Sequence, residues 1–137
     1  MKTRSQTHAG TVYTQVRQIL GVPEDIQKQY GTLCHRFPVM VLRNGLAQTL
    51  GFLAAKAGVG NDNAHAWLLN HLAQQLLNPQ ANRAQLLQSV HAANLQEYRL
   101  LTRKALAVAI WYKRYAESLL DVTAGHEANS TDTAQGG

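Results

Sequence analysis

Residues 92–121 read AANLQEYRLLTRKALAVAIWYKRYAESLLD, and this segment predicts one long helix near the C-terminus. Its apolar and small side chains recur at intervals of three and four residues: Tyr98, Leu101, Thr102, Ala105, Ala109, Tyr112, Ala116 and Leu119. That spacing places them on one face of an α-helix, so we expect this face to pack against the core.

The sequence before this segment also predicts helices, because alanine, leucine and glutamine dominate it and no run alternates apolar with polar residues. Pro38 should break or kink the chain, since proline disfavours helical geometry at the residue before it. The segment that follows Pro38 is apolar on all sides and should lie at the centre of the fold. In order toward the N-terminus, we expect helices over residues 82–90, 62–77, 38–56, 23–37 and 7–20.

These features predict an all-α fold, a compact single-domain bundle of about five to six helices with a long C-terminal helix. The 137 residues suit one domain. We assign residues 1–121 to the helical bundle. Residues 122–137 are small and polar, with too few apolar side chains to pack, and are expected to form a disordered tail.

The charge is low in total and uneven in distribution. Charged residues make up 15% of the chain, against about 25% in a typical domain. All 13 Lys and Arg fall in residues 1–121 together with six of the eight Asp and Glu, so this part carries a net charge of +7. A basic body of this kind favours an anionic partner.

Most of the basic residues on the predicted C-terminal helix share one face. At about 100° per residue, Arg99, Arg103, Lys113 and Arg114 fall within an arc of about 100° opposite the core stripe. Lys104 lies apart from them, beside Trp111. This arc is either a solvated face with i,i+4 ion pairs such as Lys113–Glu117, or a stripe that follows phosphates with Trp111 or Tyr115 available for stacking.

A second basic set surrounds Pro38 and comprises Lys28, His35, Arg36 and Arg43. We expect Arg36 to be exposed. Arg43 stands in an otherwise apolar helix beside Asn44 and one turn before Gln48, and a buried guanidinium needs partners. It either pairs within the fold or contacts another subunit.

No constellation of residues points to catalysis, a metal or a cofactor. The six histidines are scattered, and the single cysteine, Cys34, excludes an internal disulfide. Cys34 and His35 are adjacent, so on a helix their side chains diverge and do not form a nucleophile with its base. We therefore expect a protein that is not an enzyme, has no small-molecule substrate, and contains neither a signal peptide nor a membrane span. The cytoplasm is the default location.

Two blocks of sequence resemble a known family. The first is YGTLCHRFP at residues 30–38, continuing as VLRNGLAQTL at 41–50; the second is EYR at 97–99, LTRKAL at 101–106 and WYKRYA at 111–116. Their order and separation are similar to those of the small helical (fifth) subunit of the type III-B, or Cmr, CRISPR RNA-silencing complex.

The resemblance implies a non-catalytic subunit whose copies stack along the backbone of the complex and line the groove where guide RNA pairs with target RNA. Its partners would be the other Cmr subunits, further copies of itself and the two RNAs. Base pairing would read the sequence, with protein contacts directed at the sugar-phosphate backbone. The residues expected to contact RNA or another subunit are Arg36, Arg43, Arg99, Arg103, Lys104, Lys113 and Arg114. Possible subunit contacts are Tyr30, Asn44, Gln48 and Trp111.

Two other classes of function stay open from the sequence: a free-standing helical nucleic-acid-binding regulator and a protein adaptor. A regulator would show a recognition helix after a short turn. An adaptor would show an exposed apolar groove and no interaction with RNA.

Overall fold

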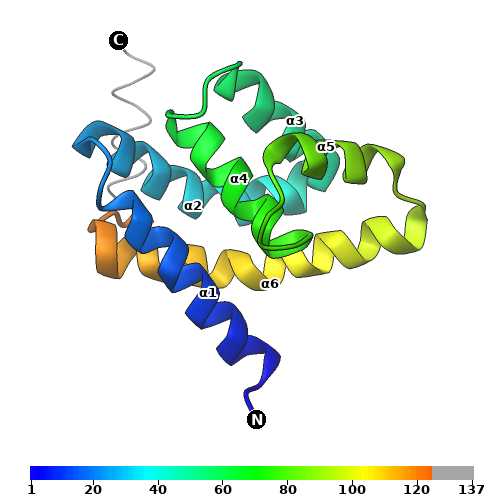
Figure 1. The fold of residues 1–137 in the computed structure, drawn as a ribbon, viewed down its shortest axis with the longest axis horizontal. Coiled ribbons are helices and arrows are strands. Elements are labelled where there is room, and N and C mark those ends of the chain that lie inside the picture. The colour runs from blue at the N-terminus through cyan, green and yellow to red at the C-terminus, as the bar shows by residue number, and fades with distance from the viewer. Residues whose placement is uncertain (125–137) are drawn as a thin grey trace.

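The computed structural model describes residues 1–124, and these form α-helices with no strand. The expected all-α bundle with a long C-terminal helix is confirmed (Figure 1). The helices are α1 (Arg4–Ile19), α2 (Glu24–Asn44), α3 (Leu46–Ala57), α4 (Ala64–Leu76), α5 (Arg83–Ala92) and α6 (Leu95–Leu120).

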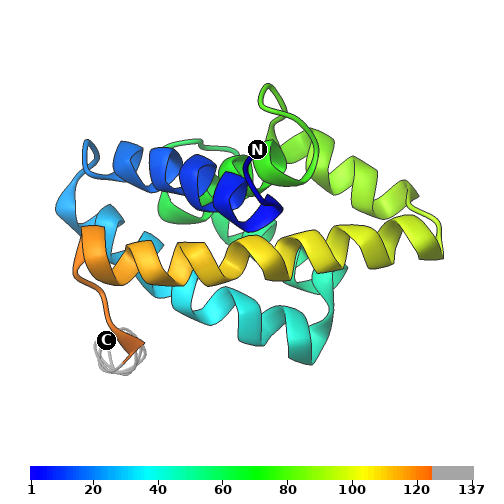
Figure 2. The same cartoon turned by 90° about the horizontal axis from the view of Figure 1, so that it is seen from below.

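The long helix α6 packs mainly against three of the other helices. Figure 2 shows it running between α1 on one side and α2 on the other, and α4 also packs against it. The predicted core stripe is confirmed in its middle part, where Ala105, Ala109, Tyr112 and Ala116 are buried. The face opposite this stripe stays open to solvent, so the basic residues on it are available to a partner.

Side-chain caps set where the helices begin. Asn94 and Glu97 form a capping box at α6, in which the Asn94 side chain accepts a hydrogen bond from the Glu97 amide and the Glu97 side chain accepts one from the Asn94 amide. Thr3 and Gln6 form the same arrangement at α1, which therefore starts at Arg4 and not at Thr7 as expected. The additional turn carries Arg4 and Ser5 into the helix.

The break expected at Pro38 is wrong. α2 continues through Pro38 to Asn44, and the chain turns instead at Gly45, whose φ is 83°. Glycine adopts this left-handed backbone without steric cost, whereas a proline inside a long helix costs one hydrogen bond and is tolerated when packing holds both sides. The amide of Gly45 donates to the Val41 carbonyl at 2.8 Å and closes α2.

The expected central position of the segment after Pro38 is also wrong. Only one side of it is buried, through residues such as Leu46, Leu50 and Leu53. On its other side Leu42 is 73% exposed and Val39 is 48% exposed. This surface therefore consists of apolar side chains that the fold itself does not cover.

The expected start of the tail at residue 122 is wrong, because Val122 is only 1% exposed. Asp121 adopts a left-handed conformation with φ 57°, which turns the chain back so that the Val122 amide donates to the Ala116 carbonyl at 3.0 Å. His35 Nε2 donates to the Val122 carbonyl at 2.7 Å. The rest of the expected tail, residues 125–137, lies outside the described residues.

Val122 fits against α2 because Gly31 has no side chain. A Cβ added at Gly31 would lie 2.6 Å from Val122 Cγ2, whereas one added at Gly51 on α3 would meet nothing within 4 Å. We predict that Gly31→Ala lowers the free energy of unfolding by about 1 kcal/mol or more through this overlap. The control Gly51→Ala should raise it by about 0.5–1 kcal/mol, since alanine is the better helix former. Chemical denaturation of the full chain measures both.

A double variant that combines Gly31→Ala with Val122→Gly tests whether overlap with Val122 causes the loss of stability. Val122→Gly should cost much less stability in the Gly31→Ala chain than in the parent chain, because the overlap is already relieved. A stabilising Gly31→Ala, equal in effect to Gly51→Ala, would contradict the contact with Val122.

Buried polar side chains connect four of the helices inside the core. The Tyr30 hydroxyl donates to His71 Nδ1 at 2.7 Å, and His71 Nε2 donates to Gln18 Oε1 at 3.0 Å. Gln15 accepts a hydrogen bond from Tyr112 and donates to the His71 carbonyl at 3.0 Å. Together with Gln18, which is exposed at the edge of the group, these buried side chains form a network that joins α1, α2, α4 and α6. We call it the buried polar network, and its geometry fixes how those helices meet.

Tyr30 is therefore a correction to the sequence-based expectation. It was a possible subunit contact, but its side chain is 0% exposed and its hydroxyl is used inside the buried polar network. Burial also raises the pKa of this phenol well above 10.0, which keeps it neutral and able to donate. Its role is to position α2 against α4.

The buried polar network should make the fold sensitive to acid. Burial lowers the pKa of His71 from 6.5 to about 4, so the folded chain keeps this imidazole neutral where the unfolded chain protonates it. Stability from this group is fully present above about pH 7 and is lost as the pH falls toward 4. The full difference corresponds to about 3 kcal/mol.

We predict that His71→Gln flattens the dependence of unfolding free energy on pH between 7 and 4.5, even though it lowers stability at neutral pH. Urea denaturation at several pH values measures this slope. The control His91→Gln, which removes an exposed imidazole from α5, should follow the parent chain. An unchanged slope in His71→Gln would show that other groups carry the acid sensitivity.

Candidate nucleic-acid interface

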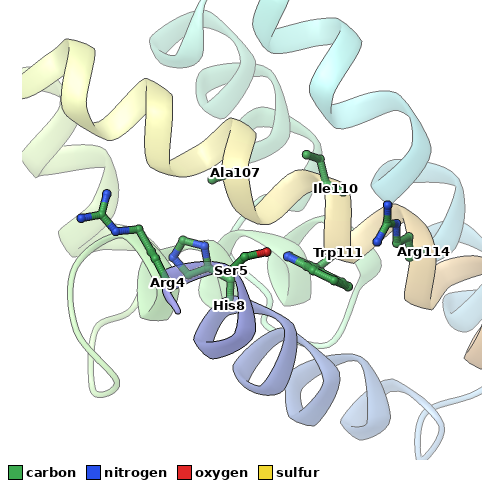
Figure 3. Close-up of a pocket in the computed structure, with 7 residues that line it drawn as sticks. All are labelled: Arg4, Ser5, His8, Ala107, Ile110, Trp111 and Arg114. Atoms are coloured by element: carbon green, nitrogen blue, oxygen red, sulfur yellow. The ribbon is translucent and has the colours of Figure 1, made fainter. Parts of the chain in front are cut away.

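A groove of about 420 Å³ lies where the start of α1 meets the middle of α6 (Figure 3). We call it the α1–α6 groove. Its lining comes from Arg4, Ser5 and His8 on α1 and from Ala107, Ile110, Trp111 and Arg114 on α6. It combines an apolar floor with cationic side chains on both helices.

Helical spacing explains why these side chains gather. Arg4 and His8 are four residues apart and so lie on one face of α1. Ala107, Trp111 and Arg114 follow at intervals of four and three along α6 and share the opposing face. Ala107 contributes only a methyl group, which leaves room between the two helices.

An aromatic row continues from the groove along the seam between the same helices. It consists of Trp111, Tyr115 and Tyr13. The Trp111 and Tyr115 rings stack with centroids 6.0 Å apart and an interplanar angle of 26°, and Tyr13 meets Tyr115 edge to face at 5.4 Å. Arginines stand at both ends, with Arg114 Cζ 4.9 Å from the Trp111 centroid and Arg17 Cζ 5.9 Å from that of Tyr13.

The groove is electropositive. The pKa of His8 is lowered by partial burial and then by the positive charges of Arg4 and Lys104. Lys104 stands seven residues, or about two helical turns, before Trp111 and therefore lies on the same side of α6. Within residues 1–124, no Asp or Glu forms an ion pair with Arg4, Lys104 or Arg114. The fold thus gathers cations from two helices without neutralising them, which is the arrangement that attracts an anion.

The basic residues expected to form one arc on the C-terminal helix differ in their exposure and surroundings. Arg99 and Arg103 are exposed on α6 and Lys113 is half-buried. Arg114 lines the groove, and Lys104, which the sequence set apart, lies with it on the same side. The ion pair Lys113–Glu117 that would suit a merely solvated face is not formed among residues 1–124. Glu117 instead approaches His35 Nε2 at 4.0 Å.

The residues near the end of α2 form a separate surface. Arg43, Asn44 and Gln48 are all exposed, so Arg43 is not a buried guanidinium that needs a partner within the fold, and contact with another subunit stays a prediction. Arg36 is half-buried and not exposed as expected. Its charge contributes, after burial and Lys56, to lowering the pKa of His65 on α4.

Sequence reasoning missed the part of the groove that α1 supplies. Arg4, His8, Tyr13 and Arg17 were not candidates, because nothing in one sequence says which helix packs against the face of α6 that holds Trp111. The available signal was the basic and aromatic content of the first helix, at spacings of four residues. It becomes informative only when α1 is placed beside α6.

Other kinds of site have little support in the described part of the chain. No group of three His, Cys, Asp or Glu side chains there could hold a metal ion. Cys34 is buried, and burial raises the pKa of its thiol, which opposes its use as a nucleophile. None of the helices in this region is both long and apolar enough to cross a bilayer.

Comparison with known proteins places the chain among CRISPR-associated proteins. A family model described as CRISPR-associated protein (Cas_Cmr5) matches residues 4–119. A protein of Thermus thermophilus named CRISPR system Cmr subunit Cmr5 is 34% identical over 121 residues, which cover 88% of this chain and 99% of that protein. The chain therefore belongs to the Cmr5 family.

A solved structure supports the same assignment. The crystal structure of a CRISPR-associated Cmr5 family protein from Thermus thermophilus matches with a TM-score of 0.73 and 34% sequence identity. The match covers 86% of this chain and 98% of that one. The resemblance seen in the sequence blocks at residues 30–50 and 97–116 is thus confirmed at the level of family and fold.

Proposed function

We propose that this chain is a non-catalytic subunit of a cytoplasmic Cmr complex, where it contacts the guide and target RNA and stacks with further copies of itself. Membership of the Cmr5 family supports the place in the complex. The contact with RNA is supported by the unpaired cations of α6 and of the α1–α6 groove.

One observation carries the proposal most directly. The α6 residues Arg99, Arg103, Lys104 and Arg114 are exposed, and none of them forms an ion pair in residues 1–124. In a chain with low total charge, cations used only for solubility would be expected to mix with carboxylates. A row of unneutralised cations matches the charge of a sugar-phosphate backbone, which such side chains contact without reading sequence.

The end of α2 suits contact with a neighbouring subunit. Arg43, Asn44 and Gln48 are exposed there beside Leu42, which presents its apolar side chain to solvent. An apolar residue surrounded by polar groups is typical of a protein interface. We assign these residues to subunit contact and the α6 residues to RNA.

The alternative of a free-standing regulator fits the geometry less well. Although α6 follows α5 after a short turn, its basic residues extend along 26 residues and onto α1 beside it, whereas a recognition helix contacts DNA mainly through its N-terminal residues. An adaptor that is indifferent to RNA would not account for the unpaired cations.

We predict that the double variant Arg99→Ala, Arg103→Ala weakens RNA retention by the assembled complex without loss of helix content. Each lost phosphate contact should lower the slope of log affinity against log salt by about 0.7 to 0.9. Filter binding of labelled target RNA across a salt series measures the slope. Both arginines are exposed on α6, so the effect on stability should stay within about 0.5 kcal/mol.

A matched control removes the same charge elsewhere. Lys28→Ala with Lys56→Ala deletes two exposed cations from α2 and α3 and should leave the salt slope near that of the parent. If RNA retention and recovery of the complex are both unchanged in the Arg99, Arg103 variant, that part of α6 is only a solvated face.

A further inference from the structure

The α1–α6 groove offers two kinds of contact within one small volume. Its floor is apolar, formed by Ala107, Ile110 and the half-buried ring of Trp111. Its rim is cationic, with Arg4 on α1 and Arg114 on α6. Figure 3 shows the Trp111 ring between these two sides, with Ser5 and His8 near one end and Arg114 near the other.

If an apolar surface covered the groove, the cations would lose water without gaining a partner, and this would cost free energy. The positive charges of Arg4 and Lys104 both act on His8 and lower its pKa. In the described part of the chain, no carboxylate forms an ion pair with Arg4, Lys104 or Arg114. An occupant must therefore bring negative charge. It must also cover the apolar floor and the indole ring.

A nucleotide meets both requirements, because its phosphate is anionic and its base has two apolar faces that stack on aromatic rings. A peptide would need an acidic and an aromatic side chain at matching positions to do the same, whereas a single nucleotide carries both groups. The volume of about 420 Å³ falls within the range of about 300–1,000 Å³ seen for ligand sites. The alternation of cation and aromatic ring is the pattern of grooves that hold single strands.

The stacking requirement also decides which form of RNA fits. In a duplex the faces of each base are covered by its neighbours, so an indole at the protein surface reaches only a base that has left the stack. The aromatic row continues from Trp111 through Tyr115 to Tyr13, which is 39% exposed, and it ends at Arg17. A strand leaving the groove in that direction would meet further rings and then another cation.

We infer that the α1–α6 groove binds one unpaired nucleotide of single-stranded RNA, with its base stacked on Trp111 and the phosphates on its two sides held by Arg4 and Lys104 at one end and by Arg114 at the other (Figure 3). This inference rests on the proposed function, since it names the subsite and the form of RNA that the subunit takes. It adds α1 to the interface.

Photo-crosslinking in the assembled complex tests the stack. Target RNA carrying 5-iodouridine at one position at a time is bound and irradiated, and the adducts on this chain are mapped by mass spectrometry. At least one position should give an adduct at Trp111, and Trp111→Leu should abolish it. The control Trp67→Phe alters the other tryptophan of the chain, on α4, and should leave the adduct in place. Adducts confined to other residues, or none on this chain, would overturn the inference.

Affinity measurements on the isolated full chain test the form of RNA. In the Trp67→Phe chain, where Trp111 is the one remaining tryptophan, oligouridine should quench the indole fluorescence at low salt, whereas duplex RNA and an abasic ribose-phosphate strand should not. Trp111→Ala should weaken oligouridine binding by about 5- to 100-fold. Arg4→Ala should weaken it and Lys28→Ala should not. Equal quenching by duplex RNA would contradict a site for an unpaired base.

The two experiments separate this inference from the proposed function. If Arg99→Ala, Arg103→Ala reduces RNA retention while no adduct forms at Trp111, the RNA-contacting role stands and the nucleotide subsite fails. If neither RNA retention nor crosslinking responds, both fail. Circular dichroism of each Trp111 variant confirms that α6 is intact, so that loss of binding reports the groove.

Discussion

The hydrogen bond that Tyr112 donates to Gln15 joins α6 to α1 in the interior of the bundle. Gln15 also hydrogen-bonds to α4, where its amide nitrogen donates to the His71 carbonyl and to Gln74 Oε1, both at 3.0 Å. A buried amide with this many partners has one geometry in which all are satisfied. The register of α1 on α6 is therefore fixed by polar contacts as well as by apolar packing.

That register has a direct effect on the surface. It brings Arg4 and His8 opposite Trp111 and Arg114, and it brings Tyr13 against Tyr115. A shift of α1 by one turn along α6 would separate the cations of the two helices and take Tyr13 away from Tyr115. The buried polar network thus positions the candidate site although none of its members lines the groove.

Periodicity made the helices predictable, because the apolar stripe of α6 and the helix-capping residues act over a few residues of sequence. The same local reasoning placed a break at Pro38. The chain turns at Gly45 instead, because glycine can adopt the positive φ required there. Local reasoning also left Val122 in a tail, since no nearby residue in the sequence indicates that Val122 packs against Gly31 of α2. Errors arose where a residue's place depends on contacts between distant segments.

In the candidate site, too, features set by nearby residues could be predicted and features set by contacts between distant segments could not. Exposed cations on one helix, such as Arg99 and Arg103, could be found by counting residues around a helical wheel. The grouping of Lys104 and Arg114 with Arg4 could not, because it needs the pairing of α1 with α6. Tyr30 is an error of the opposite kind. The family resemblance suggested it as a subunit contact, but its hydroxyl donates to His71 in the core.

The proposed role of this Cmr5-family chain depends on direct contact with RNA within its complex. Ultraviolet irradiation of cells of the native host, followed by recovery of the tagged chain and mass spectrometry of its peptides, tests that contact without any modified RNA. We expect the other Cmr subunits and CRISPR-derived guide RNA to be recovered, and nucleotide adducts to fall on peptides of α6 and of the first turns of α1. Recovery of the same complex and guide RNA with no adduct on this chain would contradict direct contact.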